Sequence, residues 1–515
     1  MKYVMIFHAN LNYAYLDPDK YEFVIRNSYE LLFDTMAENF PNTKYVFEAS
    51  GYTIEQIAKL TPDVLEKLKA AIKNGTCEFM GSPYAHPMLP NFPEEDGTWS
   101  IKFAMDVFEK YLGFKPKSLW NPECGWRSYV PHQAIANGVK NLIGDFEAYS
   151  RSKDKNGNPC RPEIYEKEFS KDPSFYSFAF KYDLEGSERA IHHPFSHIEG
   201  VEDGKLRMFL RTDRIAQFGV RYFMGMEGYT FEKYMDLIRK YSEQKPGEKE
   251  GAVIIFADDA EYIGTNGWFR LKYQNKPDNV FEVTPDSKAK LIRLVTEVEK
   301  TCGEFITYDE ACNDIEPLDD VLNVDDDAAW HGARASTWAG TPMASILRPW
   351  QDLVREKLHE KKNEMDPAIL EKAWFHLTNS YNSDGQWPPT LPNAPHIIYP
   401  FNYRYCFDNL LKAEMLVGGV DRSRLTTSAT ETMLKILTIQ QDLVLAKAET
   451  LLKNGTADEK KNAKAAKELI MASRDLDSVK KCADDVLLYP AEYTVRAESL
   501  IEARRLVGGV VLEQV

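Results

Sequence analysis

Two acidic segments far apart in the chain each follow a short apolar run. Glu123 lies in WNPECGW (120–126), and Asp258, Asp259 and Glu261 follow the run VIIFA. An apolar run that ends in a carboxylate is typical of a buried strand that delivers an acid to the rim of a parallel sheet, where barrel enzymes carry their chemistry. Two carboxylates brought together at such a rim are what cleavage of a glycosidic bond needs.

The residues around Glu123 favour a built site over a chance surface acid. Pro122 cannot donate to a strand ladder, so the strand should end there. Gly125 permits a tight turn, and Trp120 and Trp126 offer flat apolar faces on which sugar rings stack. The alternative is a loop acid beside two structural aromatics.

The second segment concentrates negative charge. Three carboxylates within four residues should raise the pKa of at least one of them, as a general acid requires at neutral pH. Asp259 is the candidate acid, with Asp258 and Glu261 beside it and Trp268 a short distance further on. The alternative is a helix N-terminus whose acids complement the dipole, which could hold for Glu261 while Asp259 is catalytic.

Polar side chains also follow the first three predicted strands. His8 and Asn10 follow the first, Glu48 the second and His86 the third. At successive strand ends they would form a ring able to bind sugar hydroxyls. For a single histidine the alternative is a buried core residue.

Apolar runs alternate with amphipathic stretches over the first 310 residues or so. This alternation predicts a barrel or a doubly wound sheet, and the polar strand ends favour the barrel. Residues 150–230 interrupt the pattern as an irregular insertion. We expect strands at Lys2–His8, Tyr45–Glu48, Cys77–Gly81, Ser118–Trp120, Asn141–Gly144 and Ala252–Asp258, and helices at Tyr21–Asn39, Pro62–Asn74, Trp99–Tyr111, Tyr229–Tyr241 and Lys288–Lys300.

The Asp-rich stretch Leu318–Asp327 indicates a boundary. Beyond it the sequence is helical in period, with abundant Leu, Ala, Lys and Glu. We therefore expect a catalytic barrel over residues 1–315, and an all-α domain over 316–515 that contributes to the active-site cleft. Helices are predicted at Ser345–Lys361, Ile369–Ser380, Tyr403–Leu416, Thr430–Asn454, Ala457–Arg474 and Ser478–Leu487.

The composition narrows the class of protein. The 515 residues include 63 Lys plus Arg and 79 Asp plus Glu, a net charge of −16, which argues against nucleic-acid binding. No run approaches the length of a membrane span, and the start does not resemble a signal peptide. The 7 cysteines are scattered and never form C-x-x-C, so we expect free thiols, no zinc and a cytoplasmic location. The oligomeric state is left open.

At these residues the chain resembles glycoside hydrolase family 57. The opening HAN is similar to the family's first motif, usually His-Gln-Pro, and departs from it. The other motifs follow in family order: FEASGYT (47–53), WNPECGW (120–126), DAEYIG (259–264), and the stretch 377–387 that contains Asp384 and Trp387.

The resemblance implies a fold, a mechanism and residue roles. The fold would be a distorted (β/α)7 barrel followed by an all-α C-terminal domain. The mechanism would be retaining, without metal or other cofactor, with Glu123 as nucleophile and Asp259 as acid/base. HANLNYA (8–14), SGYT (50–53) and GSPYAH (81–86) look most like the α-galactosidase branch, with the α-amylase and 4-α-glucanotransferase branches close.

We therefore expect a retaining α-glycosidase that acts on α-galactosides or α-glucans, or an amylase or 4-α-glucanotransferase on α-1,4-glucans. Retention requires the two carboxyl groups to lie about 5–5.5 Å apart. The partner would be an oligo- or polysaccharide. The candidate substrate-binding residues are His8, Asn10, Glu48, His86, Trp120, Trp126, Asp258, Glu261, Trp268, Asp384 and Trp387.

Two other classes of protein compete with this interpretation. A metal-dependent enzyme on a similar barrel, such as a family 38 α-mannosidase or a deacetylase, needs His plus Asp ligands, and Asn10 is a poorer ligand. His192, His193 and His197 lack nearby acids in the sequence, so metal binding there is weakly indicated. A barrel that binds carbohydrate without turnover is the other alternative; the presence of both acids argues against it.

Overall fold

The computed structural model describes residues 1–13, 16–153, 156–158, 188–243, 251–266, 282–386, 400–425, 428–475 and 488–508. The chain divides into two compact units, of which the first extends to Ser336, apart from two short segments, and the second continues from Thr337. Trp268, Trp387 and the helix predicted at 478–487 lie outside the described residues.

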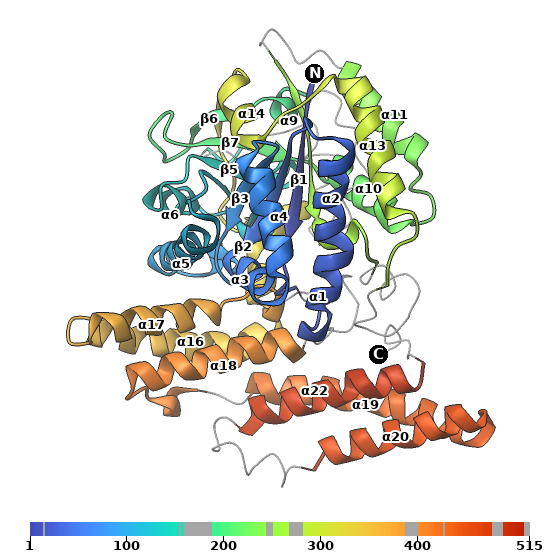
Figure 1. The fold of residues 1–515 in the computed structure, drawn as a ribbon. Coiled ribbons are helices and arrows are strands. Elements are labelled where there is room, and N and C mark those ends of the chain that lie inside the picture. Colours follow the sequence, from blue (N-terminus) through green and yellow to red (C-terminus); the bar gives the residue numbers. More distant parts are fainter. Residues whose placement is uncertain are drawn as a thin grey trace. The chain divides into compact units, whose positions relative to one another are not determined.

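The first unit is built on a curled sheet of seven parallel strands, in the order β7-β5-β4-β3-β2-β1-β8. No ladder joins β7 to β8 among the described residues, so the barrel is distorted, as predicted. Figure 1 shows β1, β2 and β3 of this sheet side by side. The strands are β1 (Lys2–Ala9), β2 (Tyr45–Ser50), β3 (Cys77–Ser82), β4 (Ser118–Trp120), β5 (Asn141–Asp145), β7 (Arg207–Arg211) and β8 (Val253–Asp259).

The region predicted as an irregular insertion carries part of this sheet. It contains α9 (Glu188–His192), β6 (Phe195–Ile198), β7 and α10 (Asp213–Met224). Strand β6 runs antiparallel to β7. The sequence did not predict β7, whose apolar residues Met-Phe-Leu lie between two arginines in the stretch that was read as an irregular insertion.

The Asp-rich stretch that we expected to mark a boundary instead begins as a strand. β10 (Leu318–Leu322) pairs with β6. The first unit continues through the hairpin of β11 (Ala328–Ala329) and β12 (Ala333–Arg334). The short strand β9 (Glu304–Phe305) adds to β1.

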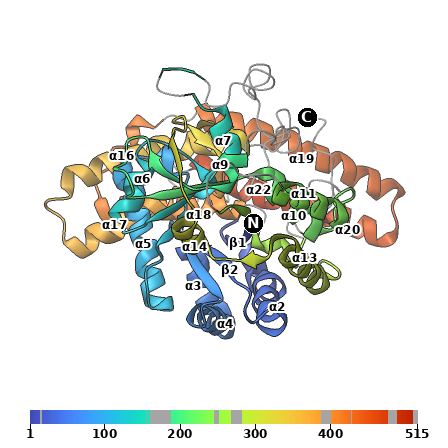
Figure 2. The same cartoon turned by 90° about the horizontal axis from the view of Figure 1, so that it is seen from above.

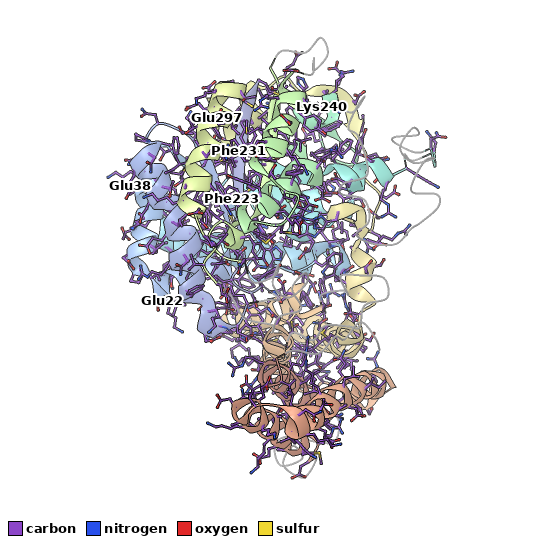
Figure 3. All side chains as sticks on the ribbon, turned by 90° about the vertical axis from the view of Figure 1, so that its right-hand side faces the viewer. Glu22, Glu38, Phe223, Phe231, Lys240 and Glu297 are labelled. Atoms are coloured by element: carbon purple, nitrogen blue, oxygen red, sulfur yellow. The ribbon has the colours of Figure 1, made fainter. Side chains whose placement is uncertain are left out.

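Helices cover the sheet from outside, which explains why its strands are apolar on both faces. Seen from above, α2 (Leu31–Asn39), α4 (Pro62–Lys73), α5 (Glu94–Leu112) and α13 (Ser287–Cys302) lie outside β1 and β2 (Figure 2). Figure 3 shows one covered face, where Phe223 of α10 and Phe231 of α11 (Phe231–Glu243) are labelled with surface acids such as Glu38. Both phenylalanines are buried. The unit also contains α3 (Gly51–Leu60), α6 (Val130–Ala136), α7 (Phe146–Arg151) and α14 (Tyr308–Asp314).

The predicted helix Tyr21–Asn39 contains a π-helical turn. α1 (Tyr21–Val24) leads into the π segment Ile25–Glu30 and then into α2. Such turns occur often at functional sites. Here the turn contains Ser28 and Tyr29, which contact the segment after β8.

The described part of the second unit is helical, as predicted. Two of its helices begin with residues that satisfy free backbone N–H groups: Thr341 accepts from the Ala344 N–H, and Thr456 and Glu459 form a capping box. No described helix could cross a bilayer. The principal helices are α16 (Pro342–Lys361), α17 (Pro367–Asn379), α18 (Pro400–Val417), α19 (Ser428–Asn454), α20 (Ala457–Ser473) and α22 (Leu488–Leu506).

Candidate active site

Glu123 lies on a strained turn directly after β4. Pro122–Cys124 forms a single 3-10 turn in which Glu123 has φ +57 and Cys124 has φ +45. The Asn121 side-chain amide closes the turn by donating to the Gly125 carbonyl at 2.6 Å. Left-handed backbone at non-glycine residues costs free energy and tends to occur at functional sites. The turn holds the Glu123 side chain in a buried position, 1% exposed.

His86 is the residue beside the Glu123 carboxylate. Its Nδ1 lies 3.6 Å from Glu123 Oε1, and its own backbone is left-handed, with φ +52. Burial, with a further contribution from the charge on His8, holds the pKa of His86 well below its ordinary value. His86 is therefore a neutral imidazole at neutral pH.

His8 is held between Glu48 and Trp120. Its Nδ1 bonds the Glu48 carboxylate, its ring stacks on Trp120 with centroids 4.8 Å apart, and it lies 5.2 Å from the His86 ring. Burial alone would lower the pKa of His8, but Glu48, and then Asp259 and Glu261, raise it to about 10. His8 thus carries a positive charge at neutral pH.

Asp259, at the end of β8, lies next to His8 of β1. β8 runs parallel to β1, and His8 is the register partner of Asp259. The strand ends therefore place Asp259 beside His8, His8 beside His86, and His86 beside Glu123. Residues from four distant segments meet at one end of the sheet, as the sequence predicted for carboxyl ends of parallel strands.

Glu261 follows in a short 3-10 turn, Ala260–Tyr262, and is held by backbone and side chain. It accepts a hydrogen bond from the Asn10 N–H at 2.8 Å and another from the Tyr29 hydroxyl. Burial raises the pKa of Glu261 to about 7, and burial also raises the pKa of Asp258. The predicted raised pKa is present, although its main cause is burial and not repulsion among the three acids.

Gly264, the last residue of DAEYIG, is required by a close approach. A Cβ there would lie 1.7 Å from the Asn27 carbonyl oxygen. Ser28 holds this contact together by donating to the Glu261 carbonyl at 2.6 Å and accepting from the Gly264 N–H at 3.2 Å. The π-helical turn and the segment after β8 therefore pack directly on each other.

Sequence reasoning missed a buried arginine at the end of β7. Arg211 donates to Asp145 at 2.9 Å, to Asp213 at 2.8 Å and to the Ala257 carbonyl at 3.0 Å. Its Nη2 also lies 3.8 Å from Asp258 Oδ2. A signal existed, because Arg211 and Asp213 follow a short apolar run just as Asp258 does.

Trp330 and His331 were also missed, since they follow no predicted strand. His331 Nδ1 lies 2.7 Å from Asp213 Oδ2, and the His331 backbone is left-handed, with φ +59. The Trp330 ring centroid is 6.3 Å from that of His8 and 6.2 Å from that of Trp120. Although burial opposes ionisation, His331 and Arg211 lower the pKa of Asp213 to about 2.

Comparison with known proteins decides the family. The family model described as glycosyl hydrolase family 57 matches residues 2–321. The chain belongs to glycosyl hydrolase family 57. This confirms the resemblance drawn from the short motifs.

The chain is similar to proteins named as an α-amylase and as a 4-α-glucanotransferase. It is 27% identical over 128 residues to an α-amylase of Pyrococcus horikoshii, covering 24% of this chain and 20% of that one. It is 20% identical over 390 residues to a 4-α-glucanotransferase of Thermococcus kodakarensis, covering 68% and 56%. The chain thus matches between a fifth and about half of the length of these two curated relatives.

A solved structure supports the fold. The 4-α-glucanotransferase of Thermococcus litoralis aligns with a TM-score of 0.57 at 17% identity, over 80% of this chain and 60% of that one. The names of these relatives favour the α-glucan part of our expectation and do not support the α-galactosidase branch.

The remaining predicted residues of the family 57 motifs lie elsewhere. Trp126 is buried, and its backbone N–H donates to the Ala328 carbonyl at 2.7 Å, at the base of the hairpin that carries Trp330. Asp384 is buried in a 3-10 turn of the second unit, and its role in substrate binding stays a prediction. Trp268 and Trp387 lie outside the described residues.

One group of acids in the first unit has the spacing of a metal site. Ligand atoms of Asp145, Glu147 and Asp213 lie within 4.8 Å of one another. Arg211 already binds two of these carboxylates, so the group is an ion-paired network and not an open set of ligands. His192 and His193 use Nδ1 toward backbone carbonyls of Val253 and Glu316, at 2.8 and 3.0 Å.

Proposed function

We propose that this protein is a retaining α-glycosidase that acts on α-glucans, with Glu123 as nucleophile and Asp259 as acid/base. The observation that carries the proposal is the series Asp259, His8, His86, Glu123 at one end of the sheet. It supports a site in which two acids from distant strands face one sugar. Family membership and the names of the relatives support the substrate class.

In the first step a Glu123 carboxylate oxygen attacks the anomeric carbon. The bond from that carbon to the leaving oxygen breaks, and Asp259 gives its proton to that oxygen. In the second step Asp259 takes a proton from water or from a sugar hydroxyl, whose oxygen displaces Glu123. Water gives hydrolysis, and a sugar hydroxyl gives transfer, so amylase and 4-α-glucanotransferase activities share this chemistry.

The surrounding residues would bind the sugar and set its charge environment. Protonated His8 can donate a hydrogen bond from Nε2 while Glu48 holds Nδ1. Neutral His86 beside Glu123 leaves that carboxylate's charge available for attack. Trp120 and Trp330 offer indole rings whose centroids lie 4.8 and 6.3 Å from that of His8.

The test is turnover of malto-oligosaccharides, with the anomeric configuration of the first products followed by NMR. Retention of the α configuration is expected, and inversion would contradict the double displacement. Glu123→Ala should lose activity by at least about 10³-fold, and added azide should restore turnover by giving the β-glycosyl azide. Asp259→Ala should lose far more activity on malto-oligosaccharides than on 4-nitrophenyl α-glucoside, whose leaving group needs no proton.

A matched control comes from the opposite end of β3. Glu78 lies near the amino end of β3, away from the carboxyl ends of the strands. It accepts hydrogen bonds from Ser118 at 2.7 Å and from the Asp309 N–H at 2.8 Å. Glu78→Gln should keep activity. Activity on 4-nitrophenyl α-galactoside alone would overturn the α-glucan assignment in favour of the galactosidase branch.

We also infer a cytoplasmic location. The five cysteines in the described part of the chain are free and buried, which suits a reducing compartment. Fractionation of the source cells with an antibody to the protein tests this, and recovery outside the cytoplasm would contradict it.

A further inference from the structure

A surface pocket of about 620 Å³ opens between α5 and α6 in the first unit. It is formed by helix residues, whereas Glu123 and Asp259 lie at strand ends. Its volume falls in the range of small-molecule sites, about 300–1,000 Å³. Residues that line it include Trp99, Lys102, Glu94, Glu95, Thr98 and Asn137.

Trp99 is the apolar surface of this pocket. Its ring stacks on that of Phe103, with centroids 5.6 Å apart and 26° between the planes. Phe103 is buried and Trp99 is partly exposed. The buried ring therefore fixes the orientation of an indole that reaches the surface, and Lys102 Nζ lies 5.6 Å from its centroid.

The polar part of the pocket is held in place by hydrogen bonds between α6 and α5 and by one within the C-terminal turn of α6. The Asn137 amide nitrogen donates to the Thr98 carbonyl at 3.2 Å and to the Gln133 carbonyl at 3.0 Å. Gln133 in turn donates to the Glu94 carbonyl at 3.0 Å. Both Asn137 amide protons are used, so its side-chain oxygen remains as an acceptor for a ligand. A site ordered before binding loses less entropy on binding.

We propose that this pocket is a second, non-catalytic binding site for an α-glucan chain; this inference rests on the proposed function. A sugar ring has an apolar C–H face that stacks on an indole and a rim of hydroxyls that both donate and accept hydrogen bonds. The pocket offers a fixed indole, carboxylate and amide acceptors, and the Lys102 ammonium, which also donates to Asp106 at 2.8 Å. A polymer held here would stay near the strand-end site between turnovers, which raises its effective concentration.

The experiment uses the full chain carrying Glu123→Gln, so that glucan is bound without turnover. Affinity electrophoresis in glycogen gels compares this parent with the parent carrying Trp99→Ala. We expect the dissociation constant to rise by about fivefold, as the loss of one stacking partner predicts. The matched control is Tyr111→Ala, which removes another aromatic side chain of α5. The Tyr111 ring contacts Lys110 and does not line the pocket. This variant should bind glycogen in the gel as the parent does.

A second variant avoids any loss of packing from Trp99. Ala136 is exposed and lines the pocket, so Ala136→Tyr fills it while keeping the indole. It should weaken binding to glycogen in the gel as Trp99→Ala does. In the parent, maltoheptaose should slow hydrogen exchange over residues 94–103.

The second site is overturned if both variants bind glycogen in the gel as strongly as the parent does. It is also overturned if maltoheptaose leaves hydrogen exchange over residues 94–103 unchanged. Equal retention in galactomannan gels would overturn its glucan specificity. These outcomes are separate from the proposed function, which is decided by turnover of malto-oligosaccharides by the wild-type chain. If the wild type processes malto-oligosaccharides and Trp99→Ala does not change binding to glycogen, only the second-site proposal is overturned.

Discussion

The guanidinium of Arg211, at the end of β7, donates its Nε–H to the carbonyl oxygen of Ala257 in β8 at 3.0 Å. No ladder joins these two strands among the described residues. A side chain therefore bridges the place where the backbone leaves the barrel open. The same arginine holds Asp145 of β5 and Asp213, so three strand ends depend on one buried cation.

Replacing Arg211 should destabilise the protein strongly. Arg211→Met would leave Asp145 and Asp213 buried without their cation, a change that costs about 3–5 kcal/mol. The free energy of unfolding, measured by urea denaturation, should fall by that amount. Arg26→Met is the control, because Arg26 pairs with Asp63 on the surface and should cost less than about 1 kcal/mol. Equal costs for the two variants would show that the Arg211 network stabilises little.

The His8–Glu48 pair should make stability depend on alkaline pH. The pKa of His8 is raised in the folded protein from 6.5 to about 10, so the folded state binds the extra proton between these values. The stabilisation is complete below pH 6.5 and is lost as the pH rises through about 10. Glu48→Gln should remove much of this dependence. NMR titration of the His8 ring should show its pKa falling in the variant, and an unchanged titration would contradict the role of Glu48.

Glu261 should make the stability of the protein depend on pH in the acidic to neutral range. Burial raises its pKa from 4.5 to about 7, so its contribution to stability is complete below pH 4.5 and is lost as the pH rises through about 7. Glu261→Gln should flatten stability between these values and alter the pH profile of activity. Glu78, whose pKa burial also raises to about 7, is the control. Glu78→Gln should flatten stability in the same window and leave the activity profile unchanged.

Gly264→Ala should damage the site through packing. The added Cβ would meet the Asn27 carbonyl at 1.7 Å, against backbone that cannot move aside cheaply. We expect a loss of more than about 2 kcal/mol of stability and reduced turnover, because Glu261 must shift. Gly75→Ala is the control, since its Cβ would meet nothing within 4 Å and only its left-handed backbone, φ +75, is unfavourable, a cost of about 1–2 kcal/mol. Similar melting temperatures for both would rule out the close contact.

The sequence was sufficient for the fold class and for most of the strands that carry the site. Six of the seven barrel strands begin within a residue of prediction, because each contains a short apolar run next to polar residues. β7 was missed because its three apolar residues lie between two arginines, within the stretch that was read as an irregular insertion. Five helices of the second unit, α16 to α20, were recognised by period, and α16 ends at Lys361, as expected. The helix α22 (Leu488–Leu506) was not predicted.

The site could be predicted only in part, because some of its contacts join residues that no local sequence pattern brings together. The residues at predicted strand ends, His8, Glu48 and His86, meet as parallel topology requires. Trp330 and His331 come from a hairpin whose position depends on tertiary packing, so spacing alone could not place them. The π-helical turn at Ile25–Glu30 was read as ordinary helix, since a single wide turn barely disturbs the apolar period.

Four non-glycine residues in and around the proposed catalytic site, His86, Glu123, Cys124 and His331, have left-handed backbone. Glycine at any of them would relieve the backbone strain but would also remove a buried side chain, which costs packing and, at His331, the ion pair with Asp213. The two effects oppose each other, so a gain in melting temperature is not expected at these positions. Engineering of this protein for hot processes should leave these four positions fixed and seek tolerance to heat in its outer helices.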